Sequence, residues 1–223
     1  MTGREATTGR HVLLAGGTSD IGWATARALR TTGARVTVAG RSATKLEPFG
    51  AEGFETMCVD LADARAVDHA FERIGRLDGL IPLVGGWRGG GGIPGQSDDD
   101  WAALEVALTA VRHTCRAAWP LLDASPSARV AVVSSTAVAH PLAGGANYAA
   151  MKAATETWIH AVAHGFSKSA RDASREQTGA CTIFRVRALS GLEETVAAHV
   201  AALWDADPSG TSADVVTVDT PND

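Results

Sequence analysis

The sequence is poor in cysteine, in aromatic residues and in positive charge. Its formal net charge of −5 provides no basic surface of the kind that binds nucleic acid. The three cysteines (Cys58, Cys115 and Cys181) are scattered and odd in number, which argues against a disulfide framework and against a zinc site. We therefore expect no nucleic-acid partner and no metal centre.

Long apolar runs are missing as well. No stretch approaches the roughly 20 apolar residues that a membrane-spanning helix needs. The N-terminal stretch MTGREATTGR is polar and lacks the apolar centre of a signal peptide. We therefore expect a cytoplasmic protein that has no membrane partner.

The chain does have enough apolar residues for a core, because 45% of its 223 residues are hydrophobic. Short apolar segments rich in β-branched residues alternate with segments of helical character. We expect strands at residues 11–17, 34–40, 54–60, 79–85, 128–135, 180–189 and 213–219. We expect helices at residues 21–32, 43–49, 65–74, 101–123, 147–167 and 192–205, and a solvated surface excursion at 167–179.

Nearly continuous apolar strands separated by helices predict a parallel sheet covered on both faces. The expected fold class is α/β: a single-domain, Rossmann-like, doubly wound parallel sheet of about seven strands with helices on both faces, over residues 1–223. Pro82 is awkward in a central strand, because proline cannot donate to the hydrogen-bond ladder. Such sheets bind ligands at the carboxyl ends of their strands, where each motif below falls.

The first strand runs into AGGTSDIG at residues 15–22. Gly16 suits the tight turn, and Gly22 allows the following helix to pack closely. The start of that helix favours an anion, and Thr18 and Ser19 add hydroxyl donors. The pattern indicates nucleotide binding; the alternative is an ordinary strand–helix turn.

The second and third strands end in AGRS and in Asp60. Dinucleotide folds that prefer NAD place an acidic residue after the second strand, but here the first charge is Arg41, followed by Ser42. A guanidinium suits a 2′-phosphate, so we expect NADP(H) to be preferred over NAD(H). Arg41 could also be an ordinary solvated residue, and Asp60 could bind adenine or cap the next helix.

Ser135, Tyr148 and Lys152 lie near the end of the fifth strand and at the start of the next helix. The spacing of Tyr148 and Lys152 puts them on one helix face, where an ammonium is expected to lower the phenol's pKa. A phenol tuned in this way can exchange a proton with a carbonyl or alcohol oxygen. A chance pair on an ordinary helix is the alternative, although Tyr148 is the chain's single tyrosine.

Together these motifs resemble the short-chain dehydrogenases/reductases over nearly the whole chain: GGTSDIG (16–22), Asp60, LDGLIPLVG (77–85), Ser135 and YAAMK (148–152). The resemblance implies that Tyr148 is the catalytic acid/base, that Ser135 orients the substrate oxygen, and that Lys152 lowers the tyrosine pKa and binds the nicotinamide ribose. The cofactor-binding residues that it implies are Gly16, Thr18, Ser19, Asp20, Ile21, Gly22, Arg41, Ser42, Asp60, Leu61, Val84, Gly85, Tyr148 and Lys152.

The chain departs from the family pattern at four places. Asp20 replaces the middle glycine of the turn, and PLVG at 82–85 replaces Asn-Asn-Ala-Gly. Ala107 stands where the family has the asparagine of its proton relay. The segment RALSGLEET at 187–195 leaves almost no room for the usual substrate loop, so the site is expected to be open or completed by a partner subunit.

The loop GGWRGG at 85–90 is similar to that of the quinoid dihydropteridine reductases. Trp87 could stack on a flat substrate ring or simply anchor the loop, and His140 is a second candidate for substrate contact. Against this narrower resemblance, that branch favours NADH and typically lacks the catalytic serine.

The first hypothesis is an NADP(H)-dependent oxidoreductase acting on a small carbonyl or alcohol, with a quinoid dihydropteridine-reductase-like enzyme as a variant of it. The alternatives are a nucleotide-binding scaffold without turnover and a non-redox enzyme on the same fold. The helices at 101–123 and 147–167 resemble those through which the family forms homodimers and homotetramers, so we expect a homo-oligomer.

Overall fold

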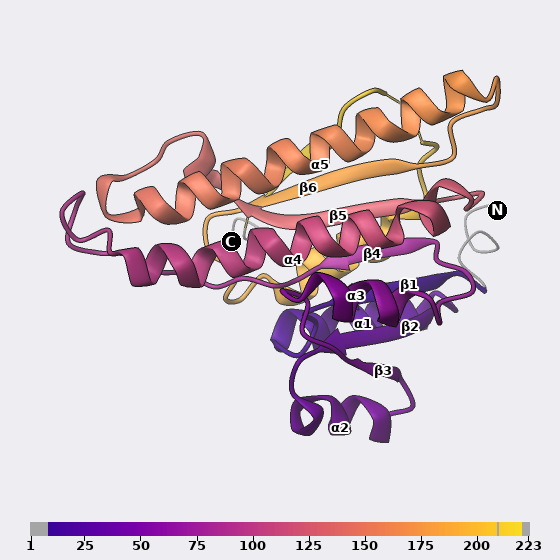
Figure 1. Cartoon of the computed structure of the whole chain (residues 1–223), viewed down its shortest axis with the longest axis horizontal. Helices are drawn as coiled ribbons and strands as arrows, with labels where there is room; N and C mark the ends of the chain where they lie inside the picture. Colours follow the sequence, from indigo (N-terminus) through magenta and orange to yellow (C-terminus); the bar gives the residue numbers. More distant parts are fainter. Residues whose placement is uncertain (1–8, 209, 220–223) are drawn as a thin grey trace.

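The computed structural model describes residues 9–208 and 210–219, and within them one parallel sheet has the strand order β3-β2-β1-β4-β5-β6-β7 (Figure 1). The strands are β1 (His11–Ala15), β2 (Arg35–Gly40), β3 (Glu55–Cys58), β4 (Gly79–Pro82), β5 (Arg129–Ser135), β6 (Ala180–Val186) and β7 (Asp214–Val218). The α-helices are α1 (Asp20–Thr31), α2 (Ala43–Ala51), α3 (Ala64–Phe71), α4 (Asp98–Asp123), α5 (Ala146–Asp172) and α6 (Glu193–Ala201). The seven-stranded α/β fold confirms the sequence expectation.

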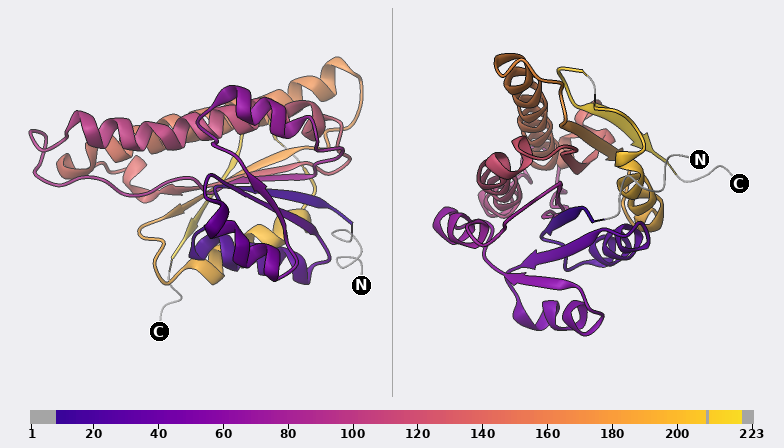
Figure 2. Two further views of the ribbon diagram at one scale, coloured as in Figure 1. Left: turned by 60° about the horizontal axis from the view of Figure 1, so that its bottom comes forward. Right: turned by 90° about the vertical axis from the view of Figure 1, so that its right-hand side faces the viewer.

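Helices cover both faces of the sheet, as the end-on view in Figure 2 shows. Helices α3, α4 and α5 lie on one face, and α1 and α6 lie on the other. Strand β1 illustrates why its sequence is apolar throughout: Leu13 and Ala15 belong to the core under the first face, whereas Val12 and Leu14 belong to the core under the second. Side chains alternate along a strand, so a strand buried on both faces needs apolar residues at every position.

Pro82 ends β4 in the middle of the sheet. Its neighbour Leu83 donates its backbone N–H to Ala15 of β1 at 2.7 Å. Backbone groups alternate in direction along a strand, so the nitrogen of Pro82 faces β5. The pairing of β4 with β5 stops at Leu80 and Val130, before the proline is reached. The missing donor therefore falls where these two strands have already separated.

The two longest helices differ from their expected limits. Helix α4 begins at Asp98, and the hydroxyl of Ser97 caps it by accepting the N–H of Asp100. Three aspartates occupy its first turn, where their charge suits the helix dipole. Helix α5 continues to Asp172, so the expected surface excursion from residue 167 is wrong in its first part. Ser167 and Ala170 are buried, which explains why the helix continues along the core.

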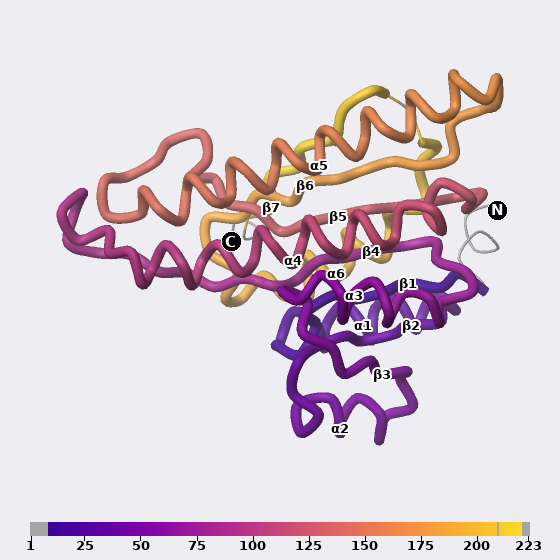
Figure 3. The backbone as a smooth tube through the Cα atoms, in the orientation of Figure 1, coloured from indigo at the N-terminus to yellow at the C-terminus, as the bar shows by residue number. Residues whose placement is uncertain are grey.

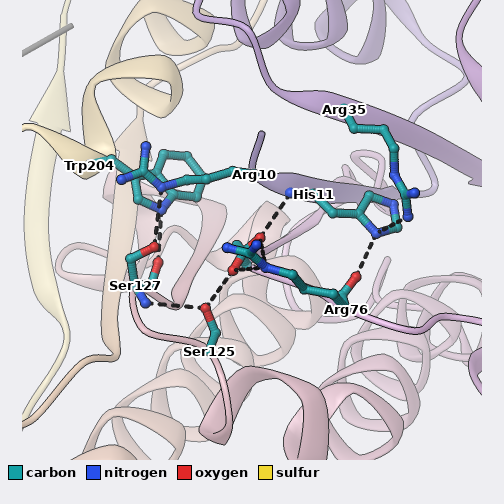
Figure 4. A network of polar contacts seen from close by, with 8 residues as sticks. Arg10, His11, Arg35, Arg76, Ser125, Ser127 and Trp204 are labelled. Atoms are coloured by element: carbon teal, nitrogen blue, oxygen red, sulfur yellow. Dashed lines mark hydrogen bonds and ion pairs between the residues drawn. The ribbon is translucent and has the colours of Figure 1, made fainter. Parts of the chain in front are cut away.

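The amino ends of β1 and β4 are closed by a network of polar side chains (Figure 4). Asp78 is fully buried and accepts hydrogen bonds from the backbone N–H of His11 (3.0 Å), the guanidinium of Arg76 (3.1 Å) and the hydroxyl of Ser125 (2.7 Å). Burial removes a carboxylate from water, which costs free energy unless hydrogen-bond donors replace the water. The three donors around Asp78 provide that replacement.

Candidate functional site

A glycine turn joins β1 to α1 at the carboxyl end of the sheet. The N–H groups of Gly16 and Gly17 both donate to the carbonyl of Ala39, at 2.8 and 3.3 Å. Gly16 has φ +84°, and a Cβ there would lie 2.3 Å from Cγ2 of Val84. A Cβ on Gly22 would lie 1.8 Å from the carbonyl oxygen of Gly17. Only glycine fits at either position, so the turn lies against both its own helix and β4.

The start of α1 has the properties of an anion site. Its N-cap residue, Ser19, makes no side-chain capping bond, so the first-turn N–H groups remain available. Asp20 is exposed in the first turn, where its charge suits the helix dipole. Ile21 is buried in the core, and Thr18 contacts the strand end at Gly40, where an added Cβ would lie 2.9 Å from its methyl group. These N–H groups are donors of the kind that a pyrophosphate accepts.

The residues after β2 and β3 lie at the same edge of the sheet. Arg41 is exposed, and the hydroxyl of Ser42 caps α2 by accepting the N–H of Lys45. The carboxylate of Asp60 accepts the N–H of Ala62 at 2.9 Å, so it stabilises its own turn and does not cap α3.

The N-cap of α3 is Asp63, which corrects the capping alternative for Asp60. The side chain of Leu61 is buried in the core under α3 and α4, and its carbonyl oxygen lies 3.3 Å from Nδ1 of His113.

Val84 and Gly85 connect the glycine turn to the residues of α5. Val84 contacts Gly16, and a Cβ on Gly85 would lie 3.8 Å from Nζ of Lys152. Gly85, Tyr148 and Lys152 line one cavity, together with Ala107 from α4. The structure therefore brings the expected nucleotide turn and the expected reactive residues to adjoining parts of one surface.

Ser135, Tyr148 and Lys152 lie together at the carboxyl end of β5. Ser135 is buried, and its hydroxyl accepts the N–H of Ala137 at 3.1 Å. Nζ of Lys152 lies 5.7 Å from the Tyr148 ring centroid and donates to the carbonyl of Val133 at 2.8 Å. Burial lowers the pKa of Lys152 to about 8.

The expected lowering of the Tyr148 pKa is wrong for the protein without ligand. Burial raises the pKa of the phenol, and the nearby hydroxyl of Ser135 opposes this only partly. The ammonium of Lys152 has no share in the shift, because it is directed at the Val133 carbonyl. Tyr148 is therefore a protonated phenol at neutral pH, which suits donation of a proton.

A buried carboxylate was missed in the sequence. Glu156 accepts hydrogen bonds from the hydroxyl of Ser134 at 2.6 Å and from Nε of Arg185 at 2.9 Å. Its negative charge raises the pKa of Lys152, against the larger effect of burial. Tyr148, Lys152 and Glu156 follow one another at intervals of four along α5, and this spacing could have revealed the third residue.

The two substrate candidates are on the surface. The side chain of Trp87 is 64% exposed in the β4–α4 connection, and His140 is exposed in the β5–α5 connection. The link from β6 to α6 spans only residues 187–192. Neither candidate is fixed by burial, so both side chains are free to contact a ligand.

Over residues 9–208 and 210–219, no group of three or more His, Cys, Asp or Glu side chains could hold a metal ion. No helix in the same ranges combines the length and the apolar character needed to cross a bilayer.

Comparisons with known proteins point to one family. The sequence model of a family described as short chain dehydrogenase matches residues 10–170. L-xylulose reductase from Homo sapiens is 40% identical over 75 residues, 33% of this chain and 31% of that protein. 3-Dehydrosphinganine reductase TSC10A from Arabidopsis thaliana is 32% identical over 138 residues, 57% of this chain and 42% of that protein. The chain thus spans less than half the length of each of these relatives.

The fold has close counterparts among solved structures. RhlG from Pseudomonas aeruginosa, in an active-site complex with NADP, superimposes with a TM-score of 0.80. The match covers 98% of both chains, at 19% sequence identity. At this identity the likeness shows the arrangement of strands and helices.

Proposed function

The chain belongs to the short-chain dehydrogenase family, and on that premise we propose that it is an NADP(H)-dependent oxidoreductase that interconverts a carbonyl and an alcohol. The observation that carries the proposal is the meeting of Ser135, Tyr148 and Lys152 beside the glycine turn at one sheet edge. Both relatives compared above are reductases by name, which agrees with it.

Tyr148 acts as the acid/base in this proposal. Its raised pKa keeps the phenol protonated at neutral pH, so it can donate its proton to the substrate's carbonyl oxygen during reduction. Ser135 holds that oxygen next to the phenol. In the protein without ligand the ammonium of Lys152 donates to the Val133 carbonyl, and in this proposal it turns toward the phenolate once the proton has been transferred. When bound, NADPH supplies the hydride that the carbonyl carbon takes up, which balances the reduction to an alcohol.

The cofactor-binding proposal assigns each part of the dinucleotide to residues at the sheet edge. Gly16, Gly22 and the start of α1, with Thr18 and Ser19, hold the pyrophosphate. Arg41 and Ser42 hold the 2′-phosphate, which is the reason to prefer NADP(H) over NAD(H). The remaining assignments follow the family resemblance: Asp60 and Leu61 at the adenine, Val84 and Gly85 along the cofactor, and Lys152 at the nicotinamide ribose. The NADP complex of RhlG supports this choice of cofactor.

The substrate is proposed to be a small molecule bound beside Trp87 and His140. The short link at residues 187–192 provides no long lid, so the β4–α4 and β5–α5 connections form the walls of the site. A flat substrate ring stacked on Trp87 would make the enzyme similar to the quinoid dihydropteridine reductases, and the exposure of that ring favours this second candidate.

Assembly and location belong to the same proposal. We propose a cytoplasmic homodimer or homotetramer built through α4 and α5, with residues 1–223 acting as one dinucleotide-binding domain. Size-exclusion chromatography with light scattering measures the assembly directly, and a monomer at micromolar concentration would contradict it.

The test of the function combines binding with turnover. NADPH and NADH are titrated by cofactor fluorescence, and NADPH oxidation is then followed with a panel of ketones, quinones and quinoid pterins. We expect turnover with at least one class, loss of that turnover in Tyr148→Phe, and nearly unchanged NADPH binding in the variant. Full activity of Tyr148→Phe would refute the role of the tyrosine.

Three outcomes would favour the other candidates. Binding of NADPH without turnover on any compound favours a nucleotide-binding scaffold. Substrate consumption with constant nicotinamide absorbance favours a non-redox enzyme, in which Tyr148 is a simple base. Activity confined to quinoid pterins favours the dihydropteridine-reductase-like candidate.

A further inference from the structure

The loops in front of α4 and α5 are joined to each other beyond the end of the sheet. The tube in Figure 3 shows the β4–α4 and β5–α5 connections side by side where these two helices begin. The backbone N–H of Gly90 donates to the carbonyl of Gly144 at 2.7 Å. From the contacts around this junction we propose that Gln96 is a positioning residue, which fixes Tyr148 by fastening the first turn of α5 to the β4–α4 connection.

The amide of Gln96 is surrounded by backbone partners from both loops. Its Nε2 lies 3.1 Å from the carbonyl oxygens of Gly90, Gly92 and Gly144. Its Oε1 accepts the backbone N–H of Asn147 at 3.1 Å. An amide NH₂ has two hydrogens, so the three carbonyls share them, and both ends of the side chain are engaged. Few side chains could replace glutamine here, because the position needs a donor and an acceptor at the end of a side chain of this length.

The bond to Asn147 acts as a helix cap supplied from a distant part of the chain. The N-cap residue of α5 is Gly145, which has no side chain to satisfy the first-turn N–H groups. Gln96 takes that role from 51 positions away, and Nδ2 of Asn147 donates in return to the carbonyl of Ser97 at 3.2 Å. The residue after Asn147 is Tyr148, so the capped turn is the one that carries the phenol.

The glycine run in the β4–α4 connection is explained by the same junction. Gly89 has φ +157°, and a Cβ there would lie 2.3 Å from the carbonyl oxygen of Gly144. A larger residue would hold the two loops apart, and the carbonyls could no longer surround the Gln96 amide. The glycines at 89–92 therefore allow the two loops to touch, and this role is independent of any contact between Trp87 and a substrate.

The consequence for turnover rests on the proposed acid/base role of Tyr148. A displacement of about 1 Å in a reacting group can cost about 100-fold in rate. Gln96→Met keeps the length of the side chain but removes both the donors and the acceptor. We expect its kcat to fall at least tenfold, while NADPH affinity stays within about twofold, because the glycine turn is on another part of the edge. Gln96→Glu keeps an acceptor for Asn147 but turns a carboxylate oxygen toward the three carbonyls, so it should not recover kcat.

Gln177 provides a matched control. Its Nε2 also bridges two backbone carbonyls, those of Gly179 (2.9 Å) and Gly210 (3.1 Å), but beyond the opposite end of α5. Gln177→Met should leave kcat within about twofold of the unmodified protein. An equal fall of kcat in both methionine variants, or no fall in Gln96→Met, would overturn the proposal.

A readout that does not need turnover separates this proposal from the function itself. Tyr148 is the single tyrosine of the chain, so ¹³C label at tyrosine Cζ gives one resonance from one site. In Gln96→Met that resonance should move toward its position in the denatured protein, with the thermal midpoint monitored alongside; in Gln177→Met it should not move. An unmoved resonance refutes the positioning role even if no substrate is found. A moved resonance with no turnover in the unmodified protein would leave the positioning role intact and count against the proposed function alone.

Discussion

The two ends of the sheet are built in opposite ways. At the amino end, Asp78, His11 and Ser125 are buried, and the carboxylate of Asp78 accepts the backbone N–H of His11 and the hydroxyl of Ser125. At the carboxyl end, the glycine turn is held by close contacts between backbones that lack side chains, as where Gly22 meets Gly17. Some groups there remain available to a ligand: the N–H groups at the start of α1 have no side-chain cap, and the Trp87 ring is exposed.

The contrast indicates that the amino end of the sheet contributes mainly to folding stability and that the carboxyl end contributes mainly to ligand binding and turnover. Side-chain and backbone donors at the amino end satisfy the buried carboxylate of Asp78, which raises stability. Glycine contacts at the carboxyl end fix the backbone while keeping space and donors open. Changes at the amino end should therefore affect folding, and changes at the carboxyl end should affect ligand binding and turnover.

The largest effect is expected from Asp78→Ala. The change leaves the N–H of His11 and the hydroxyl of Ser125 without their charged acceptor, and each such bond is worth roughly 1.5–3 kcal/mol. We expect the free energy of unfolding, measured in urea, to fall by about 3 kcal/mol or more. Asp68→Ala removes an exposed pair with Arg116 and should cost much less. Equal losses in the two variants would contradict the account of the amino end.

The next effect is expected from Gly22→Ala. The added Cβ would lie 1.8 Å from the Gly17 carbonyl, so the turn must open. NADPH affinity, measured by fluorescence titration, should fall at least tenfold, with an overpacking cost of about 1–3 kcal/mol in stability. In Gly50→Ala the new Cβ meets nothing within 4 Å, and this helical position should gain stability and keep NADPH affinity. Unchanged affinity in Gly22→Ala would exclude the turn as the binding site.

A smaller effect is expected from His11 as pH falls. Burial lowers the pKa of this imidazole in the folded protein, so the unfolded chain, with a pKa near 6.5, takes up the proton first. The stability that neutral His11 provides is complete above about pH 6.5. It is lost as the pH falls below that value, by at most about 1.4 kcal/mol per pH unit.

Urea midpoints between about pH 8 and pH 5 measure this dependence. His11→Gln should flatten it, whereas His69→Gln, at an exposed histidine, should leave it as it is. A dependence of equal slope in His11→Gln would show that another group is responsible.

The smallest effect is expected from Glu156→Gln, as a shift of the pH at which kcat declines. The Lys152 pKa of about 8 predicts that turnover depending on its ammonium declines as pH rises through that value. Loss of the Glu156 charge should shift the decline to lower pH, and the pH profile of kcat measures the shift. Glu176→Gln, at an exposed position, is the control. An unshifted profile would mean that the two groups do not interact.

Much of the fold could be predicted because its signals are local. Apolar strands such as β1 are continuous in the sequence, and a glycine pair follows at the point where a tight turn is needed. Ser135, Tyr148 and Lys152 were found by spacing, since a strand end and a helix face fix their relative positions. The limits of α5 were misjudged because polar residues such as Ser167 are buried by tertiary packing, which the sequence pattern does not reveal.

The contacts that hold the site together depend on residues far apart in the chain. Gln96 meets Asn147 only because two glycine-containing loops touch, and no local pattern encodes that meeting. The direction of the Tyr148 pKa shift depends on burial and on where the Lys152 ammonium points. Both properties need three-dimensional distances.

Transfer of deuterium tests the central claim most directly. The protein is incubated with NADPH that carries deuterium at both C4 positions of the nicotinamide and with the most active compound of the carbonyl panel, and the product is analysed by mass spectrometry. The account predicts an alcohol with one deuterium on the former carbonyl carbon, and no such product with Tyr148→Phe. A product that forms without deuterium, or NADPH binding with no product from any carbonyl, would contradict it.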